Sequence, residues 1–226
     1  MFRNLVIIGC LLVPSFADDP VIKKGAGGWK AWDKKEAPTE GWTILTYDTK
    51  EWKDASTPLG YGKEPVSTPI SFGEDAKNKH ATAYLRHVFK VEEVAAGYVI
   101  KVRMDDGAVF HVNGKEVHRL NVADATKPGE YSKWALGPGV LKQEHTLILK
   151  PDVVNVGGNV LAIALFQSGP TSSDLYLDLD VTPIDKETFE KMKKEAVQRK
   201  KKLEEAAKKR EEAEKRAAEK ESAPTA

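Results

Sequence analysis

Two adjacent carboxylates and an amide occur close together in the sequence, in an order that could bind a metal ion. Asp105 and Asp106 are followed by Gly107, and Asn113 is followed by Gly114 after a short apolar stretch. Carboxylate and amide oxygens are hard ligands, which Ca²⁺ takes in sets of six to eight. We nevertheless expect a turn, in which Asp105 makes local backbone hydrogen bonds and Gly107 adopts a positive φ, and no cofactor. A calcium site at Asp105, Asp106 and Asn113 is the alternative.

Tryptophans form a second group of candidate residues, because aromatic faces can stack on sugar rings. Trp29, Trp32 and Trp134 lie in or near predicted loops, and each could either contact a ligand or seal the core. Trp134 belongs to a long polar loop that would border a binding face. We expect Trp42 and Trp52 to lie in the core. The aromatic residues therefore favour carbohydrate as the ligand.

The five histidines are scattered, and we expect them to be ordinary strand residues. A zinc site needs at least three well-placed ligands, and no H-E-x-x-H spacing occurs. The sequence also lacks the G-x-S-x-G, phosphate-loop and dinucleotide-binding motifs. These absences predict a protein without catalytic activity. An enzyme built on histidines and carboxylates, or an accessory subunit of a hydrolase, is the alternative. The histidines are His80, His87, His111, His118 and His145.

The elements that would position these residues are mostly short strands separated by Gly, Pro and Asp turns. Asn113-Gly114 between alternating residues predicts a tight hairpin, since both central positions of a type I′ turn need positive φ. The repeating pattern predicts an all-β fold, an antiparallel β-sandwich of jelly-roll type with a long charged C-terminal α-helix. The predicted strands are 42–47, 82–91, 98–104, 108–112, 115–119, 145–149, 159–166 and 175–181.

The N-terminus has the pattern of a secretory signal peptide, residues 1–17. A positive charge precedes an apolar stretch too short to span a bilayer, and Ser15 to Ala17 form a small-x-small cleavage site. The only cysteine, Cys10, lies inside this segment, so the mature chain would have no disulfide. We expect a secreted or periplasmic cell-envelope protein without a membrane span after signal removal. A lipoprotein signal ending at Cys10 is the alternative.

Composition changes sharply at residue 185. Of the 37 residues in 185–221, 25 are charged, and Glu often precedes Lys or Arg by four positions. This predicts a long helix with Asp185 as its N-cap, followed by a disordered tail at 222–226. The helix is either solvated, with its first turns docked on the domain, or a weak coiled coil that binds a protein partner or self-associates. We also expect an N-terminal extension at 18–41 and the sandwich at 42–184.

Net charge argues against nucleic-acid binding. Residues 18–184 carry 20 basic and 23 acidic side chains, and residues 185–221 carry 14 basic and 11 acidic ones. Neither block has the large positive excess that phosphate binding requires. We therefore expect no nucleic-acid partner.

Five segments carry a resemblance to a known family, in this order: 58–62, 83–89, the hairpin from Asp105 to Arg119, 158–163 and 167–178. Together they resemble the galactose-binding-domain-like jelly rolls of secreted bacterial proteins, over roughly residues 42–182. The resemblance implies a non-catalytic module that binds glycan or a cell-surface polymer. A looser similarity to the anthrax protective-antigen-type domain implies calcium held by an Asp-Asp pair. With the tryptophan argument, these resemblances give the candidate ligand contacts Trp134, Asp105, Asp106, Asn113 and Arg119.

We expect an exported, non-catalytic binding module that recognises carbohydrate or an envelope surface. The alternative is an assembly protein, in which the sandwich is a rigid spacer and residues 185–221 bind a partner.

Overall fold

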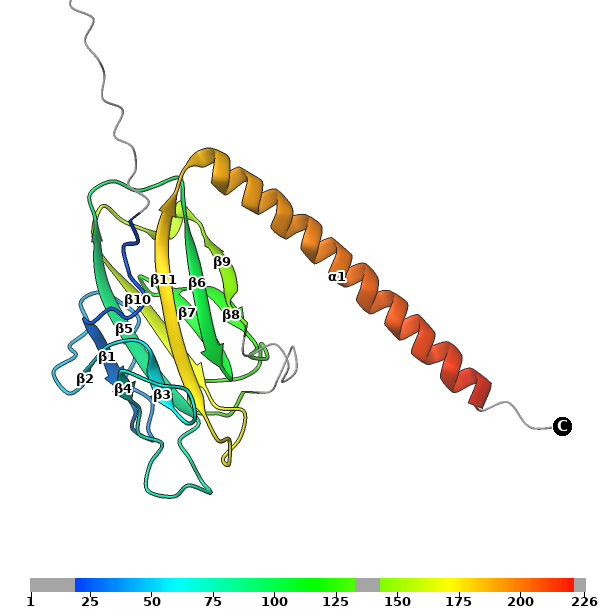
Figure 1. Ribbon diagram of the computed structural model, residues 1–226, viewed down its shortest axis with the longest axis horizontal. Coiled ribbons are helices and arrows are strands. Elements are labelled where there is room, and N and C mark those ends of the chain that lie inside the picture. Colours follow the sequence, from blue (N-terminus) through cyan, green and yellow to red (C-terminus); the bar gives the residue numbers. More distant parts are fainter. Residues whose placement is uncertain (1–18, 133–142, 222–226) are drawn as a thin grey trace, which may run out of the picture.

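Two β-sheets stack face to face, and one long α-helix extends from them (Figure 1). The computed structural model describes residues 19–132 and 143–221. The larger sheet has the strand order β2 (Lys53–Ala55), β1 (Trp29–Trp32), β5 (Thr82–Val91), β10 (Gly157–Phe166), β7 (Gly107–Val112), β8 (Lys115–Leu120). The smaller sheet has the order β4 (Thr68–Pro69), β3 (Leu59–Tyr61), β11 (Leu175–Ile184), β6 (Gly97–Asp105), β9 (His145–Leu149). The predicted all-β sandwich is confirmed.

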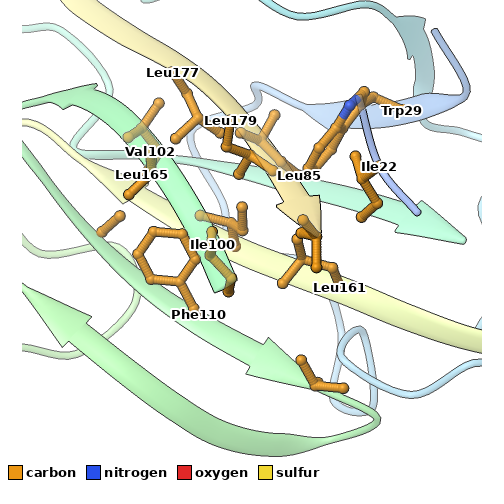
Figure 2. Packing of buried hydrophobic residues seen from close by; sticks show 14 of the residues in the cluster. Ile22, Trp29, Leu85, Ile100, Val102, Phe110, Leu161, Leu165, Leu177 and Leu179 are labelled. Carbon is orange, nitrogen blue, oxygen red and sulfur yellow. The ribbon is translucent and has the colours of Figure 1, made fainter. Parts of the chain in front are cut away.

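Alternation along the strands decides which side chains lie between the sheets. On β5, Leu85 and Phe89 point inward, whereas Tyr84 and Arg86 point to the outer face of the six-stranded sheet. Side chains that alternate in this way put one whole set into the core. Figure 2 shows this core, in which Leu161 and Phe110 of one sheet pack against the leucines of β11 in the other. The seven strands predicted from residue 82 onward are confirmed.

The central strand β10 is buried on both faces. Leu161 faces the inner core, and its neighbour Ala162 faces an aromatic cluster on the outer side. This agrees with the continuous apolar sequence of the strand. The outer cover is not a sheet or a helix but the segment 33–52, which lies between β1 and β2.

Two predicted boundaries differ from the structure. Residues 42–47 form turns rather than a strand, because their apolar side chains pack over the outer face of the six-stranded sheet instead of joining it. The segment 18–41 is not a separate extension: β1 pairs with β5, and Ile22 forms a bridge with Val181 of the other sheet. The sandwich therefore starts well before residue 42.

The hairpin between β7 and β8 turns as the sequence predicts. Asn113 and Gly114 have φ values of 50° and 89°, which suit a type I′ turn. The register shifts between Phe110 and His111, so that β8 carries one extra residue.

The helix α1 (Lys186–Glu221) begins at an N-cap and is docked at its base. The Asp185 carboxylate accepts a hydrogen bond of 2.8 Å from the Thr188 backbone N–H, as predicted. Phe189 is buried against Gly97 of β6, where a Cβ would overlap the phenyl ring. Beyond this contact the helix points away from the sandwich (Figure 1). No helix within the described residues is long and apolar enough to cross a membrane. The predicted signal peptide (1–17) and tail (222–226) lie outside the described residues.

Candidate functional site

An aromatic cluster covers the outer face of the six-stranded sheet and forms the base of the candidate site. Trp52 is its centre: its ring lies 5.8 Å from that of Trp32, 6.5 Å from that of Trp42 and 6.0 Å from that of Tyr47. Trp42 also meets Tyr84 of β5 edge-on at 5.2 Å. Trp42 and Trp52 are buried, as predicted, whereas Trp32 and Tyr47 are only partly buried. The accessible aromatic surface therefore belongs to Trp32 and Tyr47.

Arg86 of β5 ties the covering segment to the sheet. Its guanidinium donates hydrogen bonds to the backbone carbonyls of Trp42 and Ile44, the latter at 3.0 Å, and lies 5.4 Å from the Tyr47 ring centroid. Arg86 is only 2% exposed, and no carboxylate among the described residues pairs with it. Burial lowers the pKa of Arg86, but a guanidinium remains charged in proteins. A buried cation needs compensation, and here carbonyl oxygens and an aromatic ring supply it.

Two hollows meet at Trp32. The Asp33 hollow has a volume of about 480 Å³. It is lined by residues of the segments 31–36, 51–53 and 71–74 and by His80. The Tyr47 hollow has a volume of about 390 Å³ and is lined by Trp32, Tyr47 and Trp52 together with polar residues of the segment 37–51. Trp32 and Glu51 line both hollows. The indole of Trp32 is therefore reachable from two sides.

The Asp33 hollow has a rigid polar floor. The buried carboxylate of Asp33 accepts hydrogen bonds from Lys53 Nζ at 2.8 Å and from the Ser71 backbone N–H at 2.7 Å. His80 Nδ1 donates a hydrogen bond to the Asp33 carbonyl at 2.8 Å, which orients the imidazole ring. These contacts fix the floor, and the more exposed Lys34 and Glu51 remain near the rim.

The polar groups of the Tyr47 hollow are less confined. Tyr47 Oη shares a hydrogen bond of 2.9 Å with Thr39 Oγ1. Asp48 accepts a hydrogen bond from the Lys50 backbone N–H at 3.0 Å and pairs with Lys50 Nζ at 3.2 Å. Hydrogen bonds from the Lys50 backbone and side chain hold the pKa of Asp48 below its ordinary value. Asp48 is therefore a carboxylate at neutral pH.

The structure separates the three candidate calcium ligands. Asp105 and Asp106 precede β7, whereas Asn113 follows it, about 20 Å away at the usual rise of an extended strand. The three residues do not form one site, so the calcium alternative is wrong. The expected turn is wrong in one respect as well, because Gly107 is the first residue of β7 and has no positive φ. The described residues contain no cluster of three or more His, Cys, Asp or Glu that could hold a metal ion.

Asp106 and Asn113 have structural roles instead. The Asp106 carboxylate is buried and accepts hydrogen bonds from the Ser168 backbone N–H at 2.8 Å and from Ser172 Oγ at 3.2 Å. Asn113 Nδ2 donates to Asn159 Oδ1 at 2.8 Å, and its Oδ1 accepts from the Val160 backbone N–H at 3.0 Å. These bonds join the hairpin to β10 and the β6–β7 connection to the β10–β11 loop.

The other predicted contacts do not gather into a site either. Arg119 forms a two-point ion pair with Glu116, with Nη2 2.8 Å from Oε2. Asp105 borders a hollow of only about 10 Å³, too small for a ligand. Trp134 lies outside the described residues. Trp29 is fully buried in the inner core, so of Trp29 and Trp32 only Trp32 offers accessible ring surface.

The histidines that flank the hairpin lie on opposite faces of the sheet. The His111 ring packs edge-on against Trp42 at 5.7 Å on the outer side, while His118 Nε2 donates to the Ile148 carbonyl at 2.7 Å. Burial lowers the pKa of both imidazoles. They cannot share a ligand.

Tyr47 and Arg86 are important residues that were not among the candidates from the sequence. Tyr47 falls in the predicted strand 42–47 and Arg86 in the predicted strand 82–91. Their contact joins segments far apart in the sequence, so no local pattern identifies it.

No protein-family model and no curated protein sequence matches this chain. A β-glucuronidase from Bacteroides uniformis has a TM-score of 0.46 and 12% identity, over 72% of this chain and 18% of that chain. A glycosyl hydrolase family 2 member from Bacteroides cellulosilyticus gives 0.42 and 13%, over 70% and 20%. A β-glucosidase from Kluyveromyces marxianus gives 0.38 and 13%, over 71% and 17%.

The chain spans a fifth or less of the length of these three proteins.

Proposed function

We propose that this chain is a non-catalytic module that binds carbohydrate at Trp32. The observation that carries the proposal is the position of this partly buried indole between two hollows of about 480 and 390 Å³. A binding site for a polar ligand combines apolar aromatic surface with a few well-placed polar groups. The ring offers a stacking surface, and the carboxylates and ammonium groups around it can bond to hydroxyl groups.

The rigidity of the site supports recognition of a defined shape. Trp52 supports Trp32 from below, the Asp33 carboxylate is held by two hydrogen bonds, and Arg86 holds the segment that carries Tyr47. Groups that are already ordered lose less entropy when a ligand binds. The non-catalytic part of the proposal rests on the missing catalytic motifs, and export to the cell envelope rests on the pattern of residues 1–17.

The proposal is tested by a glycan array with the full chain, followed by calorimetric titration of the best-bound glycan. We expect Trp32→Ala to weaken binding about tenfold or more, since a central aromatic contact dominates such sites. Trp32→Phe keeps a ring and should retain most of the affinity. Val197→Ala, on the exposed part of α1, is the control and should bind like the parent protein. Binding unaffected by Trp32→Ala, or no binding on the array, would contradict the proposal.

A second function, assembly through α1, is favoured by the way the helix leaves the sandwich. Phe189 is buried at its base, but the described side chains from Lys193 onward are exposed, Val197 among them at 66%. A helix with such a surface either stays solvated or meets a partner. Sedimentation of the full chain and of a chain ending at Lys194 distinguishes the two. A concentration-dependent mass that only the full chain shows would support assembly, and a monomeric full chain would contradict self-association.

A further inference from the structure

Three aromatic rings surround the Tyr47 hollow at different inclinations. The Tyr47 ring is nearly perpendicular to the Trp52 ring, at 77°, and the Trp32 ring is inclined to the Trp52 ring by 44°. Trp52 is buried beneath its neighbours, so the accessible ring surface of this hollow belongs to Trp32 and Tyr47. The face of an aromatic ring is the negative part of its quadrupole, so such a space favours a positive charge.

The chain's own cations already use two of these rings. Lys34 Nζ lies 4.1 Å from the centroid of Trp32, and the Arg86 guanidinium lies 5.4 Å from that of Tyr47. Neither residue lines the Tyr47 hollow: Lys34 borders the Asp33 hollow, and Arg86 is buried against the sheet. Cations of the chain therefore already lie near both rings, and neither of them occupies the Tyr47 hollow.

The rim of the hollow carries more negative than positive charge. Two carboxylates, Asp48 and Glu51, and one ammonium group, that of Lys50, line it. Lys50 pairs with Asp48, and the nearest base to Glu51 is Lys34, at 3.4 Å on the side of the other hollow. Both carboxylates are well exposed, at 65% and 76%, so a ligand can reach them. A cation at the rings would lie next to at least one of them.

We propose that the Tyr47 hollow binds an organic ammonium group, so that the ligand of this protein is a glycan that carries such a substituent. The proposal deepens the proposed function and rests on it. An alkylated ammonium is better suited to a hollow lined by aromatic rings than a bare primary one, because its methyl groups also contact the rings and it is less strongly hydrated. A neutral substituent of the same shape would gain the contact without the charge.

The matching pair of probes is choline and its uncharged analogue 3,3-dimethylbutan-1-ol, titrated into the full chain with tryptophan fluorescence or calorimetry as the readout. We expect choline to bind about three- to tenfold more tightly than the analogue, the range of a partly exposed cation–π site. A second pair, glucosamine and N-acetylglucosamine, compares a primary ammonium group with a neutral amide on the same sugar. Equal affinity within both pairs, or no binding of any of the four, would overturn the proposal.

Two variants test whether the preference for choline over its analogue arises in the Tyr47 hollow. Tyr47→Leu keeps an apolar side chain but removes a ring, and Glu51→Gln removes an exposed carboxylate without disturbing the core. Each should reduce the preference for choline over its analogue, whereas Val197→Ala should leave it unchanged. Thermal unfolding of each variant shows whether it is folded. A preference that survives in both Tyr47→Leu and Glu51→Gln would place the cation elsewhere and contradict the proposal.

The failure of this inference differs from the failure of the proposed function. If neutral glycans bind in a Trp32-dependent way while choline and glucosamine show no preference, the ammonium site is wrong and the carbohydrate module stands. If no glycan binds at all but choline does, the hollow recognises cations and the carbohydrate proposal falls.

Discussion

The two faces of the six-stranded sheet are both buried, but by different means. The inner face is covered by another sheet, through interdigitated aliphatic side chains such as Leu161 and Leu177. The outer face is covered by the irregular segment 33–52, through aromatic side chains such as Trp42 and Trp52. Long paired strands support the inner contact, whereas Arg86 and ring contacts hold the outer one.

This difference between the two faces predicts which part of the protein can unfold locally and which part cannot. Inner contacts join strands far apart in the sequence, so their loss should unfold the whole domain. The outer cover can loosen while the sheets remain, and a loop on a rigid sheet is the usual place for a binding site. The hollows at Trp32 lie in this outer cover. The largest predicted effects therefore concern stability on the inner face, and the smaller ones concern the cover.

The largest expected effect comes from truncating the inner face. Leu161→Ala should lower the free energy of unfolding by about 2–5 kcal/mol, because it leaves a cavity between the sheets. Leu45→Ala makes the same truncation on the outer cover, where the side chain is 39% exposed, and should cost less than about 1 kcal/mol. Urea unfolding measures both values. Equal losses would show that the two faces contribute alike.

A smaller effect is expected from Arg86. Arg86→Met removes the donors to the Trp42 and Ile44 carbonyls and should cost about 1–3 kcal/mol, since buried acceptors lose their partners. Hydrogen exchange should become faster in the segment 41–47 and stay slow in β10. Arg103→Met, at an exposed ion pair with Glu64, is the control and should change neither quantity measurably. Uniformly faster exchange over both sheets would contradict a local role for Arg86.

The smallest effect is a pH dependence to which both faces contribute. Burial lowers the pKa of His111 on the outer face and of His118 on the inner one, so the unfolded chain binds more protons than the folded one as the pH falls below about 6.5. Stability should therefore decrease as the pH is lowered through this window. His111→Gln and His118→Gln should each flatten the decrease in part, as measured by unfolding between pH 7 and pH 5. An unchanged slope in the double variant would show that these imidazoles are not responsible.

Regular elements of this fold could be predicted from local sequence, because their signals repeat over many residues. Alternation identified β5 and β11, Asn113-Gly114 identified the hairpin, and Asp185 identified the start of α1. The short strands β1 and β2 have only four and three residues, too few for a pattern to appear. Their place is set by pairing with β5, which is more than 50 residues from β1 along the chain.

The candidate site was harder to predict, because contacts far apart in the sequence create it. Residues 42–47 have strand-forming side chains, but the Arg86 guanidinium and the rings beneath hold them as turns. Asp105, Asp106 and Asn113 are close in sequence, yet an intervening strand places them at opposite ends. The metal alternative was wrong because residues that are close in the sequence lie far apart in the fold. Trp32, in contrast, was a candidate from its residue type alone.

The contact between Phe189 and Gly97 fixes the direction in which α1 leaves the domain. A straight helix of 36 residues is about 54 Å long, so whatever meets its far end is held at that distance from the anchored first turn. A force on the far end of the helix is therefore transmitted to the smaller sheet at Gly97, on β6, which lies between β11 and β9. Gly97→Ala would place a methyl group where the Phe189 ring packs. The helix would then lose its fixed direction, while the hollows at Trp32 would be unaffected.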